Sequence, residues 1–382
     1  MSAPPTQKIL PYGRQTIDED DIAAVVRVLK SDYLTTGPEV AAFERELAEA
    51  CGAKHAIVVS SGTAALHVAY AAAGLGPGDE LLTTPLTFSA TANMALAVGA
   101  SVRLVDVDEG TLCLSPSLLA SAIGPRTKIV APVDFAGNPA DMDEICAIAQ
   151  RHKLITVEDA CHSIGGTLHG KPVGSLADLT VFSFHPVKTI TTAEGGAVLT
   201  NDDQLATRCR DFRSHGLVRD AARLSRNDGP WYYEIQSLGF NYRMPDVLCA
   251  LGRSQLKKLS GFVTRRREIV ARYRSALRGH PRIALQHETP GSEPGWHLFA
   301  VQVEGDRRAI FAALDAHGIK AQVHYVAVND MPLYRALGMK PEDTPTAQRA
   351  SQRLISLPLY PTLTDEDVDH VVRSLVDALA AQ

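Results

Sequence analysis

The sequence predicts an α/β protein built on a largely parallel sheet, followed by a smaller α/β unit. Between residue 56 and about residue 214, short β-branched runs alternate with helical stretches, and this rhythm is typical of parallel strands covered by helices. After residue 214 the rhythm breaks. The length of 382 residues also exceeds one ordinary core and favours two domains of unequal size. We expect a large domain at 1–250, which begins with an N-terminal arm at 1–15, and a small C-terminal domain at 251–382.

Local signals define the elements of the large domain. Strands are predicted where apolar, β-branched residues run together, and helices where a run stops at glycine or starts at a capping residue followed by proline, as at Ser115. The predicted strands cover 56–59, 80–83, 102–105, 128–133 and 154–157, with one more that ends at Ser183 and another that begins near Ala197. The predicted helices cover 63–73, 89–98, a segment that opens at Ser115, and 141–152.

The second half of the chain follows a different pattern. The polar, irregular stretch 217–234 predicts a loop or lid. Helices at 245–259 and 262–277 lead away from the first domain. The smaller unit is predicted to contain a strand at 298–303, a helix at 307–317, a strand at 320–323 and a last helix from about residue 365.

Composition argues against several classes of protein. A net charge of -5 leaves no basic footprint for nucleic acid. The first ten residues contain no apolar segment of a secretory signal, and the most apolar run, 92–100, is far shorter than the ~20 residues that a membrane helix needs. Six cysteines are scattered without a C-x-x-C pair, which predicts reduced thiols in the cytoplasm and neither disulfides nor a metal site.

Residues just after strands are the first candidates for a site, because ligands of parallel sheets bind beyond the carboxyl ends of the strands. The turn Ser60-Ser61-Gly62-Thr63 lies between a predicted strand and a predicted helix. A small, hydroxyl-bearing turn at a helix N-terminus offers free N–H groups and the positive end of the helix dipole to a phosphate. Plain capping of the helix by Ser or Thr is the alternative, and by itself it is more common.

A carboxylate follows the strand at 154–157. In the run from Glu158 to His162, Asp159 is well placed to face a pyridine nitrogen. There it would keep that nitrogen protonated and preserve the electron sink that pyridoxal phosphate (PLP) chemistry needs. The alternatives are an Asp159 that caps a loop and a His162 that lies satisfied in the core.

A lysine in a turn rich in aromatic, hydroxyl and glycine residues gives the densest signal. Lys188 lies between a strand that ends at Ser183 and the pair Gly195-Gly196. Such a setting desolvates an amine and lowers its pKa, which favours Schiff-base formation, and the glycines permit close backbone approach to a bound group. Lys188 could equally be a surface lysine. Phe88 could stack on a planar ring or be an ordinary core residue.

In their order along the chain, these motifs resemble the DegT/DnrJ/EryC1/StrS family of sugar aminotransferases. The resemblance covers essentially the whole chain, and its most specific marks are Ser-Phe-His-Pro-Val-Lys at 183–188 and Thr-Ala-Glu-Gly-Gly-Ala at 192–197. It implies the PLP-dependent fold type I, which is aspartate aminotransferase-like, with PLP or pyridoxamine phosphate as cofactor. The closest branch is the PseC type, which makes UDP-4-amino-4,6-dideoxy-N-acetyl-β-L-altrosamine on the route to pseudaminic acid. That branch is indicated by the motifs at 83–85, 88–93, 212–216 and 321–325.

The resemblance also implies roles for matching residues. Lys188 would carry the cofactor as a Schiff base and shuttle the proton. Asp159 would pair with the pyridine nitrogen, and His162 would lie by the ring hydroxyl. Phe88 would cover one face of the ring, and Cys161 stands where many relatives have a small alanine against the other face.

Phosphate and substrate contacts are implied in the same way. The residues implied to bind phosphate are Gly62, Thr63, Ser183 and, from a second subunit, Asn241. The last of these implies a homodimer with shared active sites. The residues implied to contact the substrate are His185, His324 and Tyr325.

The implied reaction moves an amino group from L-glutamate to the C4 ketone of a UDP-linked 4-keto-6-deoxy-N-acetylhexosamine. A GDP- or dTDP-4-keto-6-deoxyhexose aminotransferase of the perosamine type is the main alternative. Lys188 argues against a PLP-dependent sugar dehydratase, because those relatives carry histidine at this position. Together with Asp159 and the phosphate turn, it also argues against a non-catalytic sensor.

One segment departs from the family pattern. Two residues after Tyr325 the family usually shows a proline, whereas this chain continues Val326-Ala327-Val328-Asn329-Asp330. If this segment lines the sugar pocket, the choice of substrate within the family depends on it.

Overall fold

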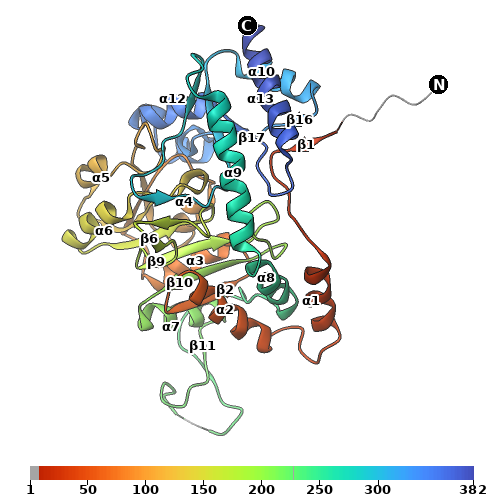
Figure 1. Cartoon of the computed structure of the whole chain (residues 1–382). Coiled ribbons are helices and arrows are strands. Elements are labelled where there is room, and N and C mark those ends of the chain that lie inside the picture. The colour runs from red at the N-terminus through yellow and green to blue at the C-terminus, as the bar shows by residue number, and fades with distance from the viewer. Residues whose placement is uncertain (1–7, 227) are drawn as a thin grey trace.

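The structure, a computed structural model, describes residues 8–226 and 228–382, so residues 1–7 of the predicted N-terminal arm lie outside it. A seven-stranded sheet of order β2-β10-β9-β6-β5-β3-β4 forms the centre of the protein (Figure 1). β10 runs antiparallel to both its neighbours and the other pairs are parallel, which confirms the predicted fold class. The strands are β2 (His55–Val59), β3 (Glu80–Thr83), β4 (Ser101–Leu104), β5 (Thr127–Ala131), β6 (Ile155–Asp159), β9 (Leu179–Ser183) and β10 (Gly196–Thr200).

Helices cover both faces of this sheet, because strand residues alternate between two apolar clusters. Ile57 and Val59 of β2 belong to one cluster, and Ala56 and Val58 to the other. The first cluster includes residues of α3 (Gly62–Ala72), α4 (Ala90–Ala97) and α7 (Asp203–Arg213). The second includes residues of α2 (Pro38–Ala50), α8 (Asp246–Leu256) and the start of α9 (Leu259–Leu277). Within the described ranges, no helix is long and apolar enough to cross a membrane.

Observed boundaries of the large sheet and its helices lie close to the predicted ones. β3 covers the four predicted residues, and α6 (Met142–Arg151) begins where Asp141 caps it by accepting a hydrogen bond from the N–H of Glu144. α5 (Pro116–Ala122) begins with its proline, as predicted. The prediction omits α2, α7 and α1 (Glu19–Leu29), although Asp18 and Asp21 form a capping box at the start of α1.

A smaller antiparallel sheet follows, with the order β13 (Ile283–Leu285), β15 (Phe299–Val303) and β17 (Leu354–Leu357). Its helices are α10 (Arg307–Ala316), α11 (Pro332–Ala336), α12 (Pro345–Arg353) and α13 (Asp365–Ala380). Three short strands, β7 (Thr167–Leu168), β8 (Lys171–Pro172) and β14 (Ser292–Glu293), form a sheet that links the two halves of the chain. The domain boundary at residue 250 stays a prediction, and α8 runs through it.

The predicted strand at 320–323 is wrong. β16 covers only Ile319–Lys320 and pairs in parallel with β1 (Leu10–Pro11) of the N-terminal arm. β1 is only two residues long, so its pairing with β16 ends at Lys320. Gln322 forms an isolated backbone bridge with Ser356 instead.

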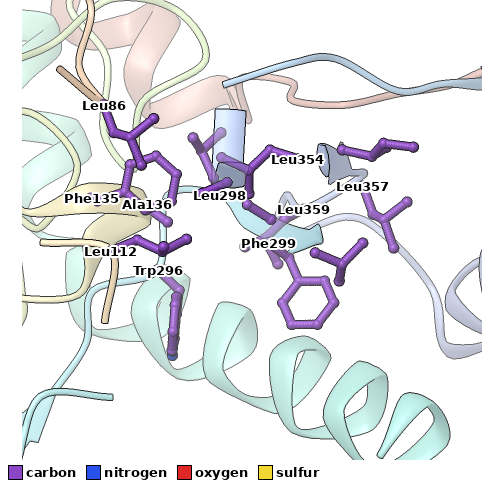
Figure 2. Close-up of a cluster of buried hydrophobic side chains, with 14 of the residues drawn as sticks. Leu86, Leu112, Phe135, Ala136, Trp296, Leu298, Phe299, Leu354, Leu357 and Leu359 are labelled. Carbon is purple, nitrogen blue, oxygen red and sulfur yellow. The ribbon is translucent and has the colours of Figure 1, made fainter. Parts of the chain in front are cut away.

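One apolar cluster joins the central sheet to the smaller one (Figure 2). Leu86 and Phe135 come from loops after β3 and β5, whereas Leu298, Leu354 and Leu359 come from the smaller unit, and all five are buried. Full burial of such a side chain stabilises the fold by roughly 1.5–3 kcal/mol. The two units therefore share a continuous core.

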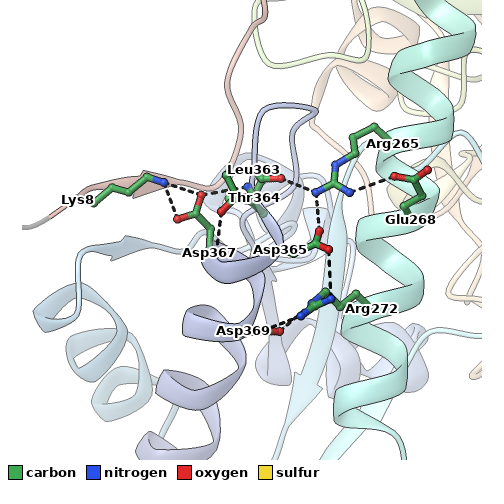
Figure 3. A network of polar contacts seen from close by, with 9 residues as sticks. All are labelled: Lys8, Arg265, Glu268, Arg272, Leu363, Thr364, Asp365, Asp367 and Asp369. Atoms are coloured by element: carbon green, nitrogen blue, oxygen red, sulfur yellow. Dashed lines mark hydrogen bonds and ion pairs between the residues drawn. The ribbon is translucent and has the colours of Figure 1, made fainter.

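A charged network on the surface reinforces this arrangement (Figure 3). Arg265 and Arg272 of α9 pair with Asp365 near the start of α13, and Arg272 also pairs with Asp369. These carboxylates are favourable at a helix N-terminus because they oppose the positive end of its dipole. The pairs are partly exposed, so each contributes little to stability by itself.

The predicted loop at 217–234 projects from the body of the protein (Figure 1). Its base is closed by β11 (Leu217–Val218) and β12 (Glu234–Ile235), which pair antiparallel. Trp231 is 71% exposed, and Leu238, just after the loop, is 76% exposed. The described part of the loop places no side chain in the cavity described below, so the lid interpretation is not supported in this chain alone.

The N-terminus of α2 depends on a side chain from another helix. Its N-cap residue, Gly37, makes no side-chain capping bond. The buried carboxylate of Asp246, at the start of α8, accepts hydrogen bonds from the N–H groups of Gly37 at 2.8 Å and Glu39 at 2.9 Å. Asp246 therefore satisfies helix N–H groups that have no partner inside α2.

We expect Asp246→Ala to lower the free energy of unfolding by about 2–4 kcal/mol, because two hydrogen bonds to a charged group are lost. Asp246→Asn keeps one acceptor oxygen and should lose less. Denaturant unfolding followed by circular dichroism measures both changes, with exposed Asp32→Ala as the matched control. Wild-type stability in Asp246→Ala would contradict the capping role.

Candidate active site

A cavity of about 570 Å³ lies beyond the carboxyl ends of the parallel strands, as expected for this type of sheet. The predicted site residues in its wall are Gly62, Thr63, Phe88, Asp159, Cys161, His162, Ser183, His185, Lys188, His324 and Tyr325. Asn241 lies outside this wall, exposed, with its backbone paired to Ser214. Its contact with phosphate across a subunit boundary stays a prediction.

Asp159 is the last residue of β6, and its buried carboxylate is held from two sides. Its Oδ2 accepts a hydrogen bond of 2.6 Å from the hydroxyl of Thr91, which also lies 2.8 Å from the hydroxyl of Thr87. Its Oδ1 accepts a hydrogen bond of 3.3 Å from the N–H of Cys161. The carboxylate is thus fixed at the cavity wall and can still accept a bond from a group inside the cavity.

Lys188 lies in a turn after β9, where its N–H donates to the carbonyl of His185 at 2.9 Å. Its side chain lines the cavity. Burial lowers the pKa of Lys188, because it disfavours the charged ammonium, while the charge of Asp159 opposes this shift. Burial also raises the pKa of the Cys161 thiol well above its usual value. The position does not match that of an ordinary solvated lysine.

The turn before α3 has the form of an anion cradle. The hydroxyl of Ser61 caps the helix by accepting a hydrogen bond of 3.0 Å from the N–H of Ala64. The first N–H groups of a helix have no partner inside it, and Gly62 and Thr63 line the cavity. A Cβ at Gly62 would lie 2.8 Å from Cβ of Ser183, so glycine keeps the cradle open. Capping and anion binding are therefore compatible at this turn.

Gly196 permits a close approach between two parts of the backbone. A Cβ at this position would lie 2.5 Å from the carbonyl oxygen of Ser61 and 2.7 Å from the nitrogen of Gly62. Glycine here therefore lets β10 pack closely against the turn after β2. The predicted approach of this backbone to a bound group stays a prediction.

Aromatic and imidazole rings line another part of the cavity. The hydroxyl of Tyr325 lies 3.0 Å from Nε2 of His162, whose ring is 4.7 Å from that of His297. The ring of Tyr12 lies 5.0 Å from that of His324. Burial and the nearby lysine hold the pKa of His162 and of His297 well below the usual range and lower the pKa of His324 to about 4. At neutral pH these imidazoles are uncharged, so they act through hydrogen bonds and ring contacts.

These features fit pyridoxal phosphate. A phosphate cradle, an amine of lowered pKa and a fixed carboxylate line one cavity. Phe88 lies in the same wall with 62% of its surface exposed, so a face of its ring is free to stack. Cys161 comes from the turn that also carries His162.

Other residues of the wall received no role from the sequence, among them Tyr12, Thr91, Glu194 and His297. Thr91 is the second residue of α4, which begins just after Phe88 and Ser89. Tyr12 comes from the N-terminal arm, and His297 from the loop before β15. Tyr12 and His297 reach the cavity through packing between distant parts of the chain, which no local sequence pattern indicates.

The segment 326–330, which departs from the family pattern, contributes no residue to the described cavity wall, and Tyr325 just before it is the last wall residue in this part of the chain. The N–H of Val328 donates to the carbonyl of Pro85 at 3.0 Å. The buried amide of Asn329 donates to the hydroxyl of Thr344 at 2.9 Å. The departure from the family pattern therefore affects residues packed behind the cavity wall more than residues that face the cavity.

Comparisons with known proteins agree with this site. The sequence profile of the DegT/DnrJ/EryC1/StrS aminotransferase family matches residues 15–376. The spore coat polysaccharide biosynthesis protein SpsC of Bacillus subtilis is 41% identical over 375 residues, which cover 96% of this chain and 96% of SpsC.

Solved structures are similar over nearly their full length. Helicobacter pylori PseC, an aminotransferase involved in the biosynthesis of pseudoaminic acid, is 32% identical with a TM-score of 0.91, covering 98% of this chain and 100% of its own. The putative sugar aminotransferase Spr1654 from Streptococcus pneumoniae, in its PLP form, is 30% identical with a TM-score of 0.91, covering 98% of this chain and 99% of its own.

The predicted family, fold class and cofactor are confirmed by these likenesses. They extend across both the central sheet and the smaller unit, so they concern the whole chain and not one motif. The chain belongs to the DegT/DnrJ/EryC1/StrS aminotransferase family and is a pyridoxal-phosphate-dependent sugar aminotransferase.

Proposed function

We propose that the enzyme transfers the amino group of L-glutamate to the C4 ketone of a UDP-linked 4-keto-6-deoxy-N-acetylhexosamine. The product would be UDP-4-amino-4,6-dideoxy-N-acetyl-β-L-altrosamine, a precursor of pseudaminic acid. The observation that carries the amino transfer is Lys188, desolvated in the same cavity as Asp159 and the phosphate cradle. The choice of sugar is supported by the whole-length likeness to PseC.

Pyridoxal phosphate, when bound, supplies the electron sink that makes a proton on the donor carbon removable. Lys188 would bind the cofactor and carry that proton, and its lowered pKa suits an amine that must both take up and release one. Asp159 would face the ring nitrogen, and Thr91 keeps the carboxylate of Asp159 oriented. His162 and Tyr325, which lie within hydrogen-bond distance of each other, would lie by the ring hydroxyl.

The remaining predicted residues hold the phosphate and the substrate. Gly62, Thr63 and Ser183 would hold the phosphate, while Phe88 and Cys161 would cover the two faces of the ring. The uncharged imidazole of His324 and the phenol of Tyr325 can each donate to and accept from sugar hydroxyls. The residues that we propose for substrate contact are His185, His324 and Tyr325.

We further propose a homodimer with shared active sites. Lys188 is the one lysine or arginine in the described cavity wall, whereas the cofactor, the nucleotide sugar and glutamate all bring negative charge. Further donors must therefore come from elsewhere, and Asn241 of a second copy is our candidate. Trp231 and Leu238, which are exposed near it in the sequence, offer apolar surface for the contact. The six unpaired cysteines favour a cytoplasmic location.

A GDP- or dTDP-linked 4-keto-6-deoxyhexose is the alternative acceptor. It is kept as the alternative because the identity to SpsC, 41%, exceeds that to PseC, 32%, and SpsC is named for the biosynthesis of spore coat polysaccharide. The chemistry of Lys188 and Asp159 is the same for either acceptor.

Lys188→Ala should abolish amino transfer, with a loss of at least about 10²–10⁴-fold, because both the attachment point and the proton carrier are gone. The purified variant should also lack the yellow colour expected of the wild type with bound PLP. Product formation and the visible spectrum measure the two effects, with exposed Lys30→Ala as the control. Retained turnover would remove Lys188 from its proposed role.

Thr91→Val should weaken cofactor binding by at least about tenfold, because a hydrogen bond to a charged group contributes roughly 1.5–3 kcal/mol. Thr91→Ser keeps the hydroxyl and should stay near the wild type. Titration of the cofactor-free protein with PLP, followed by absorbance, gives both affinities. Equal affinities for the two variants would show that Thr91 does not orient Asp159.

The acceptor is tested with a panel of UDP-, GDP- and dTDP-linked 4-keto sugars supplied with glutamate. We expect a product with the mass of the amino sugar from the UDP-linked 4-keto-6-deoxy-N-acetylhexosamine. Mass spectrometry reads the outcome, and Lys188→Ala provides the blank. Amination of only a GDP- or dTDP-sugar would replace the proposed substrate with the alternative.

A further inference from the structure

Two buried carboxyl groups lie behind Asp159, on the other face of the sheet. Side chains alternate along a strand, so Glu158 points away from the face that carries Asp159. Val133 forms a backbone bridge with Asp159, and Asp134, the next residue, therefore lies on the side of Glu158. Both carboxyls are fully buried, and the cavity wall contains neither.

Donors satisfy three of the four carboxyl oxygens in this pair. Asp134 accepts hydrogen bonds from the N–H of Ala140 at 2.9 Å and from the hydroxyl of Ser163 at 2.5 Å. Oε2 of Glu158 accepts from the hydroxyl of Thr180 at 2.9 Å. Oε1 of Glu158 is buried and has no hydrogen-bond partner among the described residues, and its side chain lies on the same side of the sheet as that of Asp134.

Two ionised carboxylates can only accept hydrogen bonds, so a contact between them requires a proton on one. We propose that Glu158 carries this proton at neutral pH and donates it to Asp134 in a hydrogen bond, which makes Glu158 a positioning residue for Asp159 and His162. The catalytic part of this inference rests on the proposed function, whereas the protonation does not.

The pair connects the segments that carry the cavity residues. The N–H of Asp134 donates to the carbonyl of Asp159 at 3.1 Å. The carboxylate of Asp134 holds Ser163, the residue after His162. Without the proton on Glu158, two negative charges would meet away from water, and an unpaired buried charge is costly. The proton thus keeps the end of β6 and the following turn in place.

Electrostatics agree with this geometry. Burial raises the pKa of Glu158 well above its usual value and that of Asp134 to about 7. The other titratable groups that interact electrostatically with the two carboxyls are also acids. They are Asp159, Cys113, Cys146 and Cys161. Within the described residues, no group of three or more His, Cys, Asp or Glu is placed to hold a metal ion. Because the pair lies among acids, a proton on one of its carboxyls reduces the repulsion between buried negative charges.

Infrared spectroscopy of the full-length, cofactor-free protein at neutral pH tests the proton directly. A protonated carboxyl has a carbonyl stretching band that ionised carboxylates lack. We expect that band to lose intensity in Glu158→Gln but not in Glu342→Gln, the exposed control. Glu158→Gln keeps an acceptor toward Thr180 and an N–H donor toward Asp134. A wild type without the band, or an unchanged band in Glu158→Gln, would overturn the proposal.

Turnover and the cofactor spectrum test the positioning role. Glu158→Ala should reduce kcat by about 10- to 100-fold with a much smaller change in KM, because a misplacement of about 1 Å can cost ~100-fold. It should also shift the pH profile of the cofactor absorbance, and Glu158→Gln should restore most of both. Equal impairment of the two variants, or wild-type behaviour of Glu158→Ala, contradicts the role.

The experiments distinguish a failure of the proposed protonation of Glu158 from a failure of the proposed function. If Glu158→Ala does not fold, the infrared comparison of the wild type with Glu158→Gln still decides whether Glu158 bears the proton. If the wild type aminates none of the 4-keto sugars, the proposed function fails and the infrared result is unaffected.

Discussion

The register of β6 between β5 and β9 is the constraint on which the site depends. In that register Asp159 lies opposite Val181 and Glu158 opposite Thr180. A slip of one residue would exchange the faces of the two carboxyl groups, placing the glutamate in the cavity and the aspartate in the core behind it. Residues two apart share a face, so the same register brings Ser183 to the cavity side, and Lys188 lies in the turn that follows.

Burial has opposite effects on the acids and bases around this edge, because it always disfavours the charged form. It lowers the pKa of Lys188 and His162, and it raises the pKa of Cys161 and Glu158. Burial thus favours the uncharged form of each of these four groups. In such surroundings each remaining charge acts more strongly on a bound group than it would in water.

The sequence was informative where function follows a strand end. Asp159 and Lys188 were predicted because each comes just after a recognisable apolar run, and the structure places both in one cavity. Sequence reasoning failed where a segment takes its shape from a distant partner. The ladder of β16 is cut short by the two-residue strand of the arm, and Tyr12 and His297 reach the cavity only through packing across the two units.

The pairing of Leu10 with Ile319 has a consequence for the order in which the pocket forms during translation. Chains emerge from the ribosome N-terminus first, and domains fold as units as they appear. The central sheet can bring together the lysine, the aspartate and the phosphate turn while the C-terminal part is still being synthesised. The arm that carries Tyr12 is among the earliest segments made, but its strand β1 can pair with β16 only after residue 320 has been added. The cofactor side of the pocket is thus assembled early, and the side lined by Tyr12, His324 and Tyr325 is completed at the end of synthesis.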